Sequence, residues 1–198
     1  MKRLIVATNN PGKINEIQKY FAYLPIEVYS LKDLEEVPEI VEDGTTFAEN
    51  ARKKAEVVAT YYPHDIIMAD DSGLEVDILE GKPGVFSARY AGENASDTAN
   101  NVKLLEQLKG LPSFRKTARF CCAIAIKAPG QETTIVEGCC SGLIAEETRG
   151  EGGFGYDPLF IVEAYDKTFA EMSLEVKNEI SHRSKALTKA ARVLEKLL

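Results

Sequence analysis

The stretch IIMADDSGLEVDIL, residues 66–79, joins a segment typical of a buried strand to a pair of negative charges. Ile66–Ala69 has the apolar composition of a strand in the interior of a sheet. An ionised carboxylate is costly to remove from water unless a positive group neutralises it. Asp70 and Asp71 must therefore either reach solvent at a turn or lie against a cation at the end of that strand.

Segments typical of strands and helices alternate in the first half of the chain, and consecutive strands dominate the second half. Apolar periodicity and turn signals predict helices at residues 14–24, 46–62, 96–109 and 182–198. They predict strands at residues 2–8, 26–30, 66–69, 118–128, 133–142 and around 161–162. This order favours an α/β fold with a mixed sheet. Because no repeat, low-complexity tract or linker interrupts the pattern, residues 1–198 are predicted to form a single domain.

The charge and hydropathy of the chain argue against two classes of function. The 198 residues include 24 basic and 31 acidic side chains, giving a net charge of −7. A nucleic-acid or membrane-surface binder needs a basic stripe, which this balance disfavours. No apolar run reaches the length of a membrane span, and MKRLIVATNN is too short and too soon interrupted for a signal peptide. We therefore expect a cytoplasmic protein with no nucleic-acid and no membrane partner.

The four cysteines occur as two dipeptides, Cys121-Cys122 and Cys139-Cys140, in two segments predicted to be strands. No CxxC spacing is present, so a zinc site is not expected. If the two strands form a hairpin, the dipeptides lie near each other. We interpret all four as small buried apolar residues in a reducing compartment, in preference to disulfides or catalytic thiols.

The hexapeptide TNNPGK lies between a predicted strand and a predicted helix, where backbone N–H groups and the helix dipole can bind an anion. Thr8, Asn9 and Asn10 add short polar side chains, Gly12 allows close approach to the backbone, and Lys13 adds a positive charge. The sequence GxxxxGK[ST] is absent, so this is not a Walker A loop. The alternative is an ordinary capped turn with an exposed lysine.

Glu42 and Asp43 lie just ahead of a predicted helix and, taken alone, are typical of a solvated acidic loop. Together with Asp70 and Asp71 they form a set of oxygen ligands, which suits Mg²⁺ or Mn²⁺. The sequence therefore indicates that the two aspartates end a strand where a metal cation can neutralise them. Lys54, on the helix that follows, is either a phosphate contact or a solvated lysine.

The stretch GGFGYDP, residues 152–158, combines glycines with Phe154 and Tyr156. Glycines permit close backbone approach, and an aromatic side chain on such a loop can stack on a flat base. The alternative is a tight turn with both aromatic rings packed into the core.

The tripeptide SHR, residues 181–183, begins the last predicted helix. His182 and Arg183 lie at a helix N-terminus, where the dipole disfavours cations. That placement weakly indicates an anionic or carbonyl-rich partner, and the alternative is that both are surface residues.

Six stretches in order resemble the inosine triphosphate pyrophosphatase family of non-canonical purine nucleoside triphosphatases, and they span nearly the whole chain. They are TNNPGK, EDGTTFAENARKKA, ADDSGLEVD, PGVFSARYAG, GGFGYDPLF and ISHRSKAL. The resemblance implies an elongated, curved mixed sheet flanked by helices in two lobes, with the active site in the cleft between them. It also implies a homodimer, a Mg²⁺ requirement, and hydrolysis of ITP, dITP or XTP to the nucleoside monophosphate and pyrophosphate.

The resemblance also assigns roles to individual residues. The phosphates would be held, with help from Lys54, by Thr8, Asn9, Asn10, Pro11, Gly12 and Lys13. The metal would be bound by Glu42 and Asp71, and Asp71 would also be the general base. The substrate would be contacted by Ser72, Phe154, Gly155, Tyr156, Asp157, Lys177, His182 and Arg183. Two alternatives remain open. One is a nucleotide hydrolase with another base preference or another product, and the other is a purine-nucleotide-binding protein without catalysis.

Overall fold

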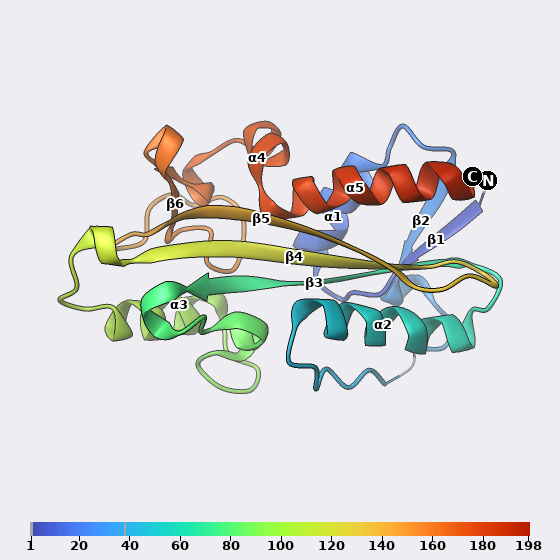
Figure 1. The fold of residues 1–198 in the computed structure, drawn as a ribbon, viewed down its shortest axis with the longest axis horizontal. Coiled ribbons are helices and arrows are strands. Elements are labelled where there is room, and N and C mark those ends of the chain that lie inside the picture. The colour runs from blue at the N-terminus through green and yellow to red at the C-terminus, as the bar shows by residue number, and fades with distance from the viewer. Residues whose placement is uncertain (1, 38) are drawn as a thin grey trace. The chain divides into compact units, whose positions relative to one another are not determined.

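The computed structural model describes residues 2–37 and 39–198. Across these residues, seven strands form one mixed sheet in the order β2-β1-β3-β4-β5-β6-β7, drawn in Figure 1. The strands are β1 Lys2–Val6, β2 Ile26–Ser30, β3 Ile66–Val76, β4 Thr117–Lys127, β5 Thr134–Ile144, β6 Phe160–Val162 and β7 Lys167–Thr168. The helices are α1 Pro11–Tyr20, α2 Phe47–Tyr61, α3 Asp97–Gln107, α4 Leu174–Ile180 and α5 His182–Leu197. The predicted α/β fold with a mixed sheet is confirmed.

The parallel part of the sheet is built around β1, which pairs with β2 on one side and with β3 on the other. Leu4 lies opposite Ile66 and Val6 lies opposite Met68. All four side chains are buried, which explains why both strands read as apolar runs without alternation. The helices α1 and α2 lie in the connections that such parallel strands require.

The antiparallel part of the sheet consists of β4 to β7. The N–H of Ile144 donates to the carbonyl of Lys116 at 2.9 Å, and β6 is antiparallel to both β5 and β7. Gly142 in β5 has no room for a side chain, because a Cβ there would overlap the carbonyl oxygen of Ile161. The two-residue strand β7 and the helix α4 were not predicted from the sequence.

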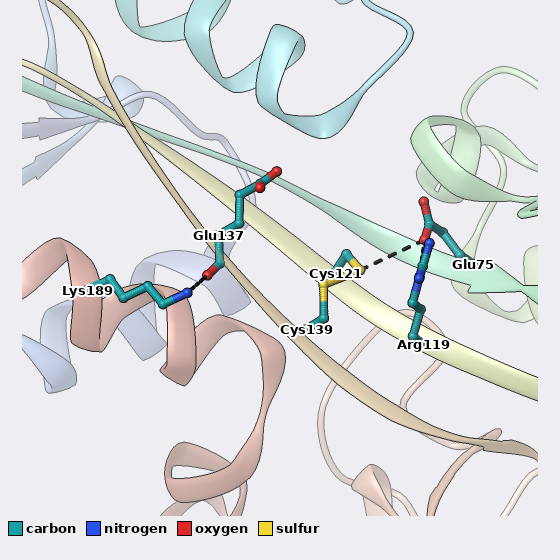
Figure 2. Close-up of a disulfide and its surroundings, with 6 residues drawn as sticks. All are labelled: Glu75, Arg119, Cys121, Glu137, Cys139 and Lys189. Atoms are coloured by element: carbon teal, nitrogen blue, oxygen red, sulfur yellow. Dashed lines mark hydrogen bonds and ion pairs between the residues drawn. A yellow bond between two sulfur atoms is a disulfide. The ribbon is translucent and has the colours of Figure 1, made fainter.

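The interpretation of all four cysteines as thiols is wrong for two of them. Cys121 in β4 and Cys139 in β5 form a disulfide (Figure 2). Cys122 and Cys140 are buried and lie outside the disulfide, as expected. The predicted proximity of the two dipeptides is confirmed.

The strand β3 does not stop at Ala69 but runs without a break from Ile66 to Val76. Asp70 is fully buried inside it and Asp71 is 8% exposed. The turn alternative is therefore wrong, and the two aspartates require positive partners within the fold.

The chain divides into two compact units. The first comprises the described part of residues 1–71, with residues 122–138 and 183–198, and the second comprises residues 72–121 and 139–182. The expectations of a single domain over residues 1–198 and of an active site in a cleft remain predictions.

The core of the first unit lies between its strands and the helices α1 and α5, which Figure 1 draws on the same side of β3. Ile17 on α1, Phe21 just after that helix, and Leu187 and Leu194 on α5 belong to the same core cluster as buried strand residues such as Met68. The Tyr20 hydroxyl lies 2.7 Å from the Thr188 hydroxyl and adds a polar link between the two helices.

The core of the second unit is aromatic. Phe120, Phe160 and Phe169 contact one another, with ring centroids 4.8–5.9 Å apart. The His182 ring stacks on Phe120 at 4.7 Å with an interplanar angle of 13°. Leu104 of α3 completes the apolar contact from the helical side.

Local capping residues mark the starts of the helices α2 and α3. The Thr46 hydroxyl accepts the N–H of Glu49, and the Thr46 N–H donates to the Glu49 carboxylate, which forms a capping box at the start of α2. Ser96 caps α3, and α5 begins at His182. Among the described helices, none is long and apolar enough to cross a membrane.

Candidate active site

The turn between β1 and α1 is closed by Asn10, which caps the helix. Its side-chain oxygen accepts the N–H groups of Gly12 at 2.9 Å and Lys13 at 3.2 Å, while Pro11 occupies the first turn of the helix. The Thr8 hydroxyl accepts the Asn10 N–H at 3.2 Å. The backbone is therefore a capped turn, and an anion here would meet side-chain donors or replace the Asn10 oxygen.

Lys13 is not the exposed lysine of the alternative interpretation. Its side chain is 13% exposed and its ammonium group forms an ion pair with the buried carboxylate of Asp70. The turn thus brings one cation against the first of the two aspartates. Asp70 therefore lies against a cation and does not reach solvent at a turn.

Asp70 binds a second cation and a thiol as well. Arg183 Nε donates to its Oδ2 at 3.0 Å, and the Cys122 sulfur lies 2.9 Å from the same oxygen. Burial alone would raise the pKa of Asp70, but Arg183 and Lys13 outweigh it and hold the pKa well below its usual range. Asp70 therefore stays ionised at neutral pH and anchors both cations.

Arg183 is 2% exposed, so the interpretation of this residue as a surface cation is wrong. Its second donor, Nη1, binds Glu16 Oε2 at 2.6 Å. Burial opposes its charge, but Asp70 and Glu16 more than compensate and raise its pKa. Glu16 was missed in the sequence, although it follows Lys13 by three residues on α1 and so lies on the same helix face.

Asp71 belongs to a separate cluster centred on Lys54. The Lys54 ammonium lies 3.0 Å from Asp71 Oδ1 and 3.0 Å from Glu42 Oε2. Lys54 is 7% exposed, so the solvated-lysine alternative is wrong. The sequence indicated that a cation faces the aspartate, and in the protein chain that cation is Lys54.

Burial shifts the pKa of Asp71 more than any neighbouring charge does. Removal from water raises the pKa of Asp71, Lys54 and Lys13 lower it in part, and Glu42 raises it again. For Lys54, burial disfavours the charge, yet Asp71 and Glu42 outweigh burial and raise its pKa. A carboxylate with a raised pKa is a better proton acceptor than a solvated one.

The donor set of this cluster fits Mg²⁺. Glu42 and Asp71 direct oxygen atoms to one point that already accommodates a positive group, the Lys54 ammonium. In the part of the chain that the structure describes, no group of three or more His, Cys, Asp or Glu side chains converges. Mg²⁺ commonly uses one or two carboxylates and completes its shell with water and substrate phosphates. The metal assignment to Glu42 and Asp71 remains a prediction.

Asn50 and Gly44 hold the Asp71 cluster in place, and both were missed as site residues. The Asn50 side chain donates to Asp71 Oδ2 at 3.2 Å, and its oxygen accepts the Gly44 N–H at 2.8 Å. A Cβ on Gly44 would lie 2.6 Å from the Asn50 oxygen and 2.9 Å from Glu49 Cβ. The loop that carries Glu42 is therefore fixed to the helix that carries Lys54.

Gly44→Ala is expected to displace Asn50 and lower the free energy of unfolding by about 1–3 kcal/mol, the typical cost of overpacking. Activity per folded molecule should also fall, because Asn50 contacts Asp71. Asp43→Ala is the matched control, since Asp43 is exposed and pairs only at the surface with Lys53. Urea unfolding of both variants checks this, and equal stabilities would contradict it.

A second cluster lies in the second unit around Asp157. Asp157 Oδ2 accepts the Phe154 N–H at 2.9 Å and pairs with Lys177 Nζ at 2.6 Å. The Lys177 ammonium lies 4.9 Å from the centroid of the Phe154 ring, within cation–π range. Gly153 has a φ of +74°, and a Cβ there would collide with the Asp157 carboxylate. These contacts position the Phe154 ring, which is itself half-buried.

The rest of this loop is anchored to α3 and to residues before it. Asp97 accepts the Gly155 N–H at 2.7 Å, and Asn101 donates to the Gly155 carbonyl at 3.1 Å. The Tyr156 hydroxyl donates to the Ser87 carbonyl at 2.9 Å, and Tyr156 is 4% exposed. The core-packing alternative is therefore correct for Tyr156, and Phe154 keeps the exposed surface that stacking requires.

The structure groups the predicted site residues in two sets. Lys13, Glu42, Lys54, Asp71 and Arg183 belong to the first unit, and Ser72, Phe154, Asp157, Lys177 and His182 belong to the second. His182 is 4% exposed, so it is not the surface residue of the alternative interpretation. Asn9 makes none of the contacts described above for this turn, and its role stays a prediction.

Comparisons with known proteins show which family the chain is similar to. A model of the Ham1 family matches residues 4–193. The dITP/XTP pyrophosphatase of Bacillus subtilis is 52% identical over 195 residues, covering 98% of each chain. That of Desulforamulus reducens is 51% identical over 195 residues, covering 98% of this chain and 96% of its own.

The solved structures most informative here are two Ham1 proteins. The Staphylococcus aureus Ham1 protein superimposes with a TM-score of 0.88 at 43% identity, covering 100% of both chains. That from Coxiella burnetii gives a TM-score of 0.89 at 39% identity, covering 99% of this chain and 100% of the other. The resemblance drawn from the sequence motifs is confirmed, and the chain belongs to the Ham1 family.

Proposed function

We propose that this protein hydrolyses non-canonical purine nucleoside triphosphates, namely dITP, XTP and ITP, to the nucleoside monophosphate and pyrophosphate. The observation that carries the proposal is the convergence of Glu42 and the buried Asp71 on one cation, the Lys54 ammonium, while Lys13 pairs with the adjacent Asp70. The names of the relatives, dITP/XTP pyrophosphatases at about half identity over the whole chain, support the substrate class.

The first cluster provides the groups that cleavage of a phosphoanhydride needs. Glu42 and Asp71 would hold Mg²⁺, which when bound neutralises charge on the phosphate oxygens. Lys13 and Lys54 add positive charge where negative charge develops, and such preorganised charges are a large source of rate enhancement. Asp71 accepts the proton of the attacking water as general base.

The second cluster provides the groups that recognise a base. Phe154 offers a ring on which a purine stacks, and Lys177 is a donor held beside that ring by Asp157. Donors at the edge of the base favour a 6-oxo group over the 6-amino group of adenine. A site built on such polar complementarity can discriminate by roughly four to five powers of ten. We assign base recognition to Ser72, Phe154–Asp157, Lys177, His182 and Arg183.

The remaining parts of the proposal concern cofactor, assembly and location. We infer Mg²⁺ as the physiological metal, a homodimer as the assembly, and the cytoplasm as the compartment. The net charge of −7 supports the absence of nucleic-acid and membrane-surface partners.

A panel of nucleoside triphosphates with Mg²⁺ tests the substrate class. We expect kcat/KM for dITP, XTP and ITP to exceed that for dATP by at least about a hundredfold. Equal rates across the panel would overturn the base preference. Tight binding of dITP without Mg²⁺-dependent turnover would instead favour the alternative of a nucleotide-binding protein without catalysis.

Phe154→Ala tests the assignment of the second cluster. Loss of one base-stacking contact is worth about 1–3 kcal/mol, so KM for XTP should rise roughly 5- to 150-fold. Tyr165→Ala is the matched control, because Tyr165 is an exposed aromatic of the same unit. We choose Phe154 over Arg183 because Arg183→Ala would remove one charged partner from each of two buried carboxylates. An unchanged KM in Phe154→Ala would remove the ring from substrate binding.

A further inference from the structure

The disulfide between Cys121 and Cys139 joins two neighbouring strands rather than two distant loops (Figure 2). The Cα atoms lie 4.3 Å apart, close to the approximately 4.5 Å of directly opposed residues in an antiparallel pair. Pairing of β4 with β5 therefore holds the two side chains together whether or not the sulfurs are bonded. Such a pair can open and close without refolding.

The two cysteine residues differ in exposure. Cys139 is an exposed residue, whereas Cys121 is only 9% exposed. The Cys121 sulfur lies 3.9 Å from a carboxylate oxygen of Glu75, which also accepts Arg119 Nε at 2.6 Å (Figure 2). A small molecule in solution therefore reaches the Cys139 sulfur first.

The other two cysteines are protected from the same reagents. Successive side chains face opposite sides of a strand, so Cys122 and Cys140 point away from the face that carries the disulfide. Both are buried. Burial and the nearby Asp70 carboxylate raise the pKa of the Cys122 thiol well above its usual range, so it forms little thiolate.

We propose that Cys121 and Cys139 form a reversible thiol–disulfide site that exchanges with low-molecular-weight thiols and their disulfides. In the reducing direction, the thiolate of a small thiol attacks the Cys139 sulfur and breaks the Cys121–Cys139 bond. The electron pair leaves on the Cys121 sulfur, which takes up a proton. A second small thiolate attacks the small-molecule sulfur of the mixed disulfide, and Cys139 leaves and is protonated.

The net reaction converts one protein disulfide and two small thiols into two protein thiols and one small disulfide. The reverse reaction closes the bond, with the small disulfide as the oxidant. This proposal does not depend on the substrate of the enzyme. Its failure would therefore leave the proposed function unaffected, and the reverse also holds.

Both cysteines of the site belong to the second unit, and each is its last or first residue in a stretch of the chain. The division falls between Cys121 and Cys122 in β4 and between Gly138 and Cys139 in β5. The bond closes a loop with a sequence separation of 18 residues. Opening it should lower the melting temperature by roughly 6–12 °C, the shift typical of losing a bond across a loop of this size in a protein of this length.

Redox titration of the native protein tests reversibility. The protein is equilibrated in glutathione buffers from fully reduced to fully oxidised, alkylated, and mapped by mass spectrometry. We expect Cys121 and Cys139 to change together from alkylated to protected, while Cys122 and Cys140 stay unlabelled throughout. A disulfide that persists in reduced buffer until the protein unfolds, or a pair that stays alkylated in oxidised buffer, would overturn the proposal.

Single variants test which sulfur is attacked. Cys121→Ser should accumulate a glutathione mixed disulfide on Cys139, because the second thiol that would expel glutathione is missing. Cys139→Ser should acquire little adduct on the buried Cys121, and Cys140→Ala should titrate like the wild type. Adducts on both single variants, or on neither, would contradict the proposed route. The double variant Cys121→Ser/Cys139→Ser should melt at the same temperature in oxidised and reduced buffer, and a redox-dependent shift there would also contradict it.

Discussion

Asp71→Asn is expected to lower turnover of dITP by at least roughly 10²–10⁴-fold, the range typical of losing general-base assistance. The substitution keeps the size of the side chain but removes the proton acceptor and one negative charge beside Glu42. Weaker Mg²⁺ binding should reduce activity further. Steady-state pyrophosphate release at saturating Mg²⁺ measures the effect. Asp43→Asn is the control, because it removes an exposed carboxylate from the neighbouring loop.

The stability of Asp71→Asn separates a chemical role from a structural one. The pKa of Asp71 is raised in the folded protein, so its ionisation costs stability, and that cost appears as the pH rises from the unfolded pKa through the folded one. Asparagine removes this cost but also withdraws a partner from Lys54. The opposing effects should leave the melting temperature in EDTA within about 4 °C of the wild type, a change near 1 kcal/mol. Near-normal turnover, or lost activity with a collapsed melting temperature, would contradict the assignment.

Lys13→Ala is expected to lower kcat/KM roughly 30- to 1000-fold. Loss of one charged contact in a preorganised site costs about 2–4 kcal/mol of transition-state stabilisation. The sequence alone predicts an intact fold, because Lys13 lies at a turn. The ion pair with the buried Asp70 changes that expectation, and we expect the melting temperature to fall by roughly 2–12 °C, since Arg183 still compensates the carboxylate.

The two effects of Lys13→Ala can be separated by measuring kinetics well below the melting temperature. Lys19→Ala is the matched control, because Lys19 is an exposed lysine on the same helix. A variant with a lowered melting temperature but wild-type kcat/KM would make Lys13 a counter-charge for Asp70 and no more.

Helix starts and apolar strands were predictable because their signals are local. The capping box of Thr46 and Glu49 acts within four residues, and so does the Ser96 cap. The helix α4, with 7 residues, and the strand β7, with 2, are too short to produce a periodic pattern.

The partners of the two aspartates were not predictable in the same way. The cost of burying charge left a solvent-exposed turn or a cation as alternatives for Asp70 and Asp71, and the sequence favoured a metal cation over side chains. Lys54 lies 17 residues from Asp71 in the sequence, and Arg183 lies 113 residues from Asp70. Only the folded chain brings them together. The resemblance of the motifs to a known family indicated Lys13, Glu42 and Lys54 as site residues. It did not indicate Asn50.

The disulfide could not be predicted from the sequence for a similar reason. Both cysteine dipeptides were expected in neighbouring strands, yet the opposed positions of Cys121 and Cys139 depend on the register of β4 and β5. A shift by one residue would exchange the faces on which the cysteines lie. The hydrophobic pattern of these segments did not specify that register.

The identity of the products formed from dITP tests the central claim most directly. The wild-type protein is incubated with dITP in Mg²⁺ or in EDTA, and pyrophosphate, orthophosphate and the nucleotide product are quantified together. We predict equal amounts of dIMP and pyrophosphate in Mg²⁺, with no orthophosphate and no turnover in EDTA. Formation of dIDP and orthophosphate, or no reaction in Mg²⁺, would contradict the account.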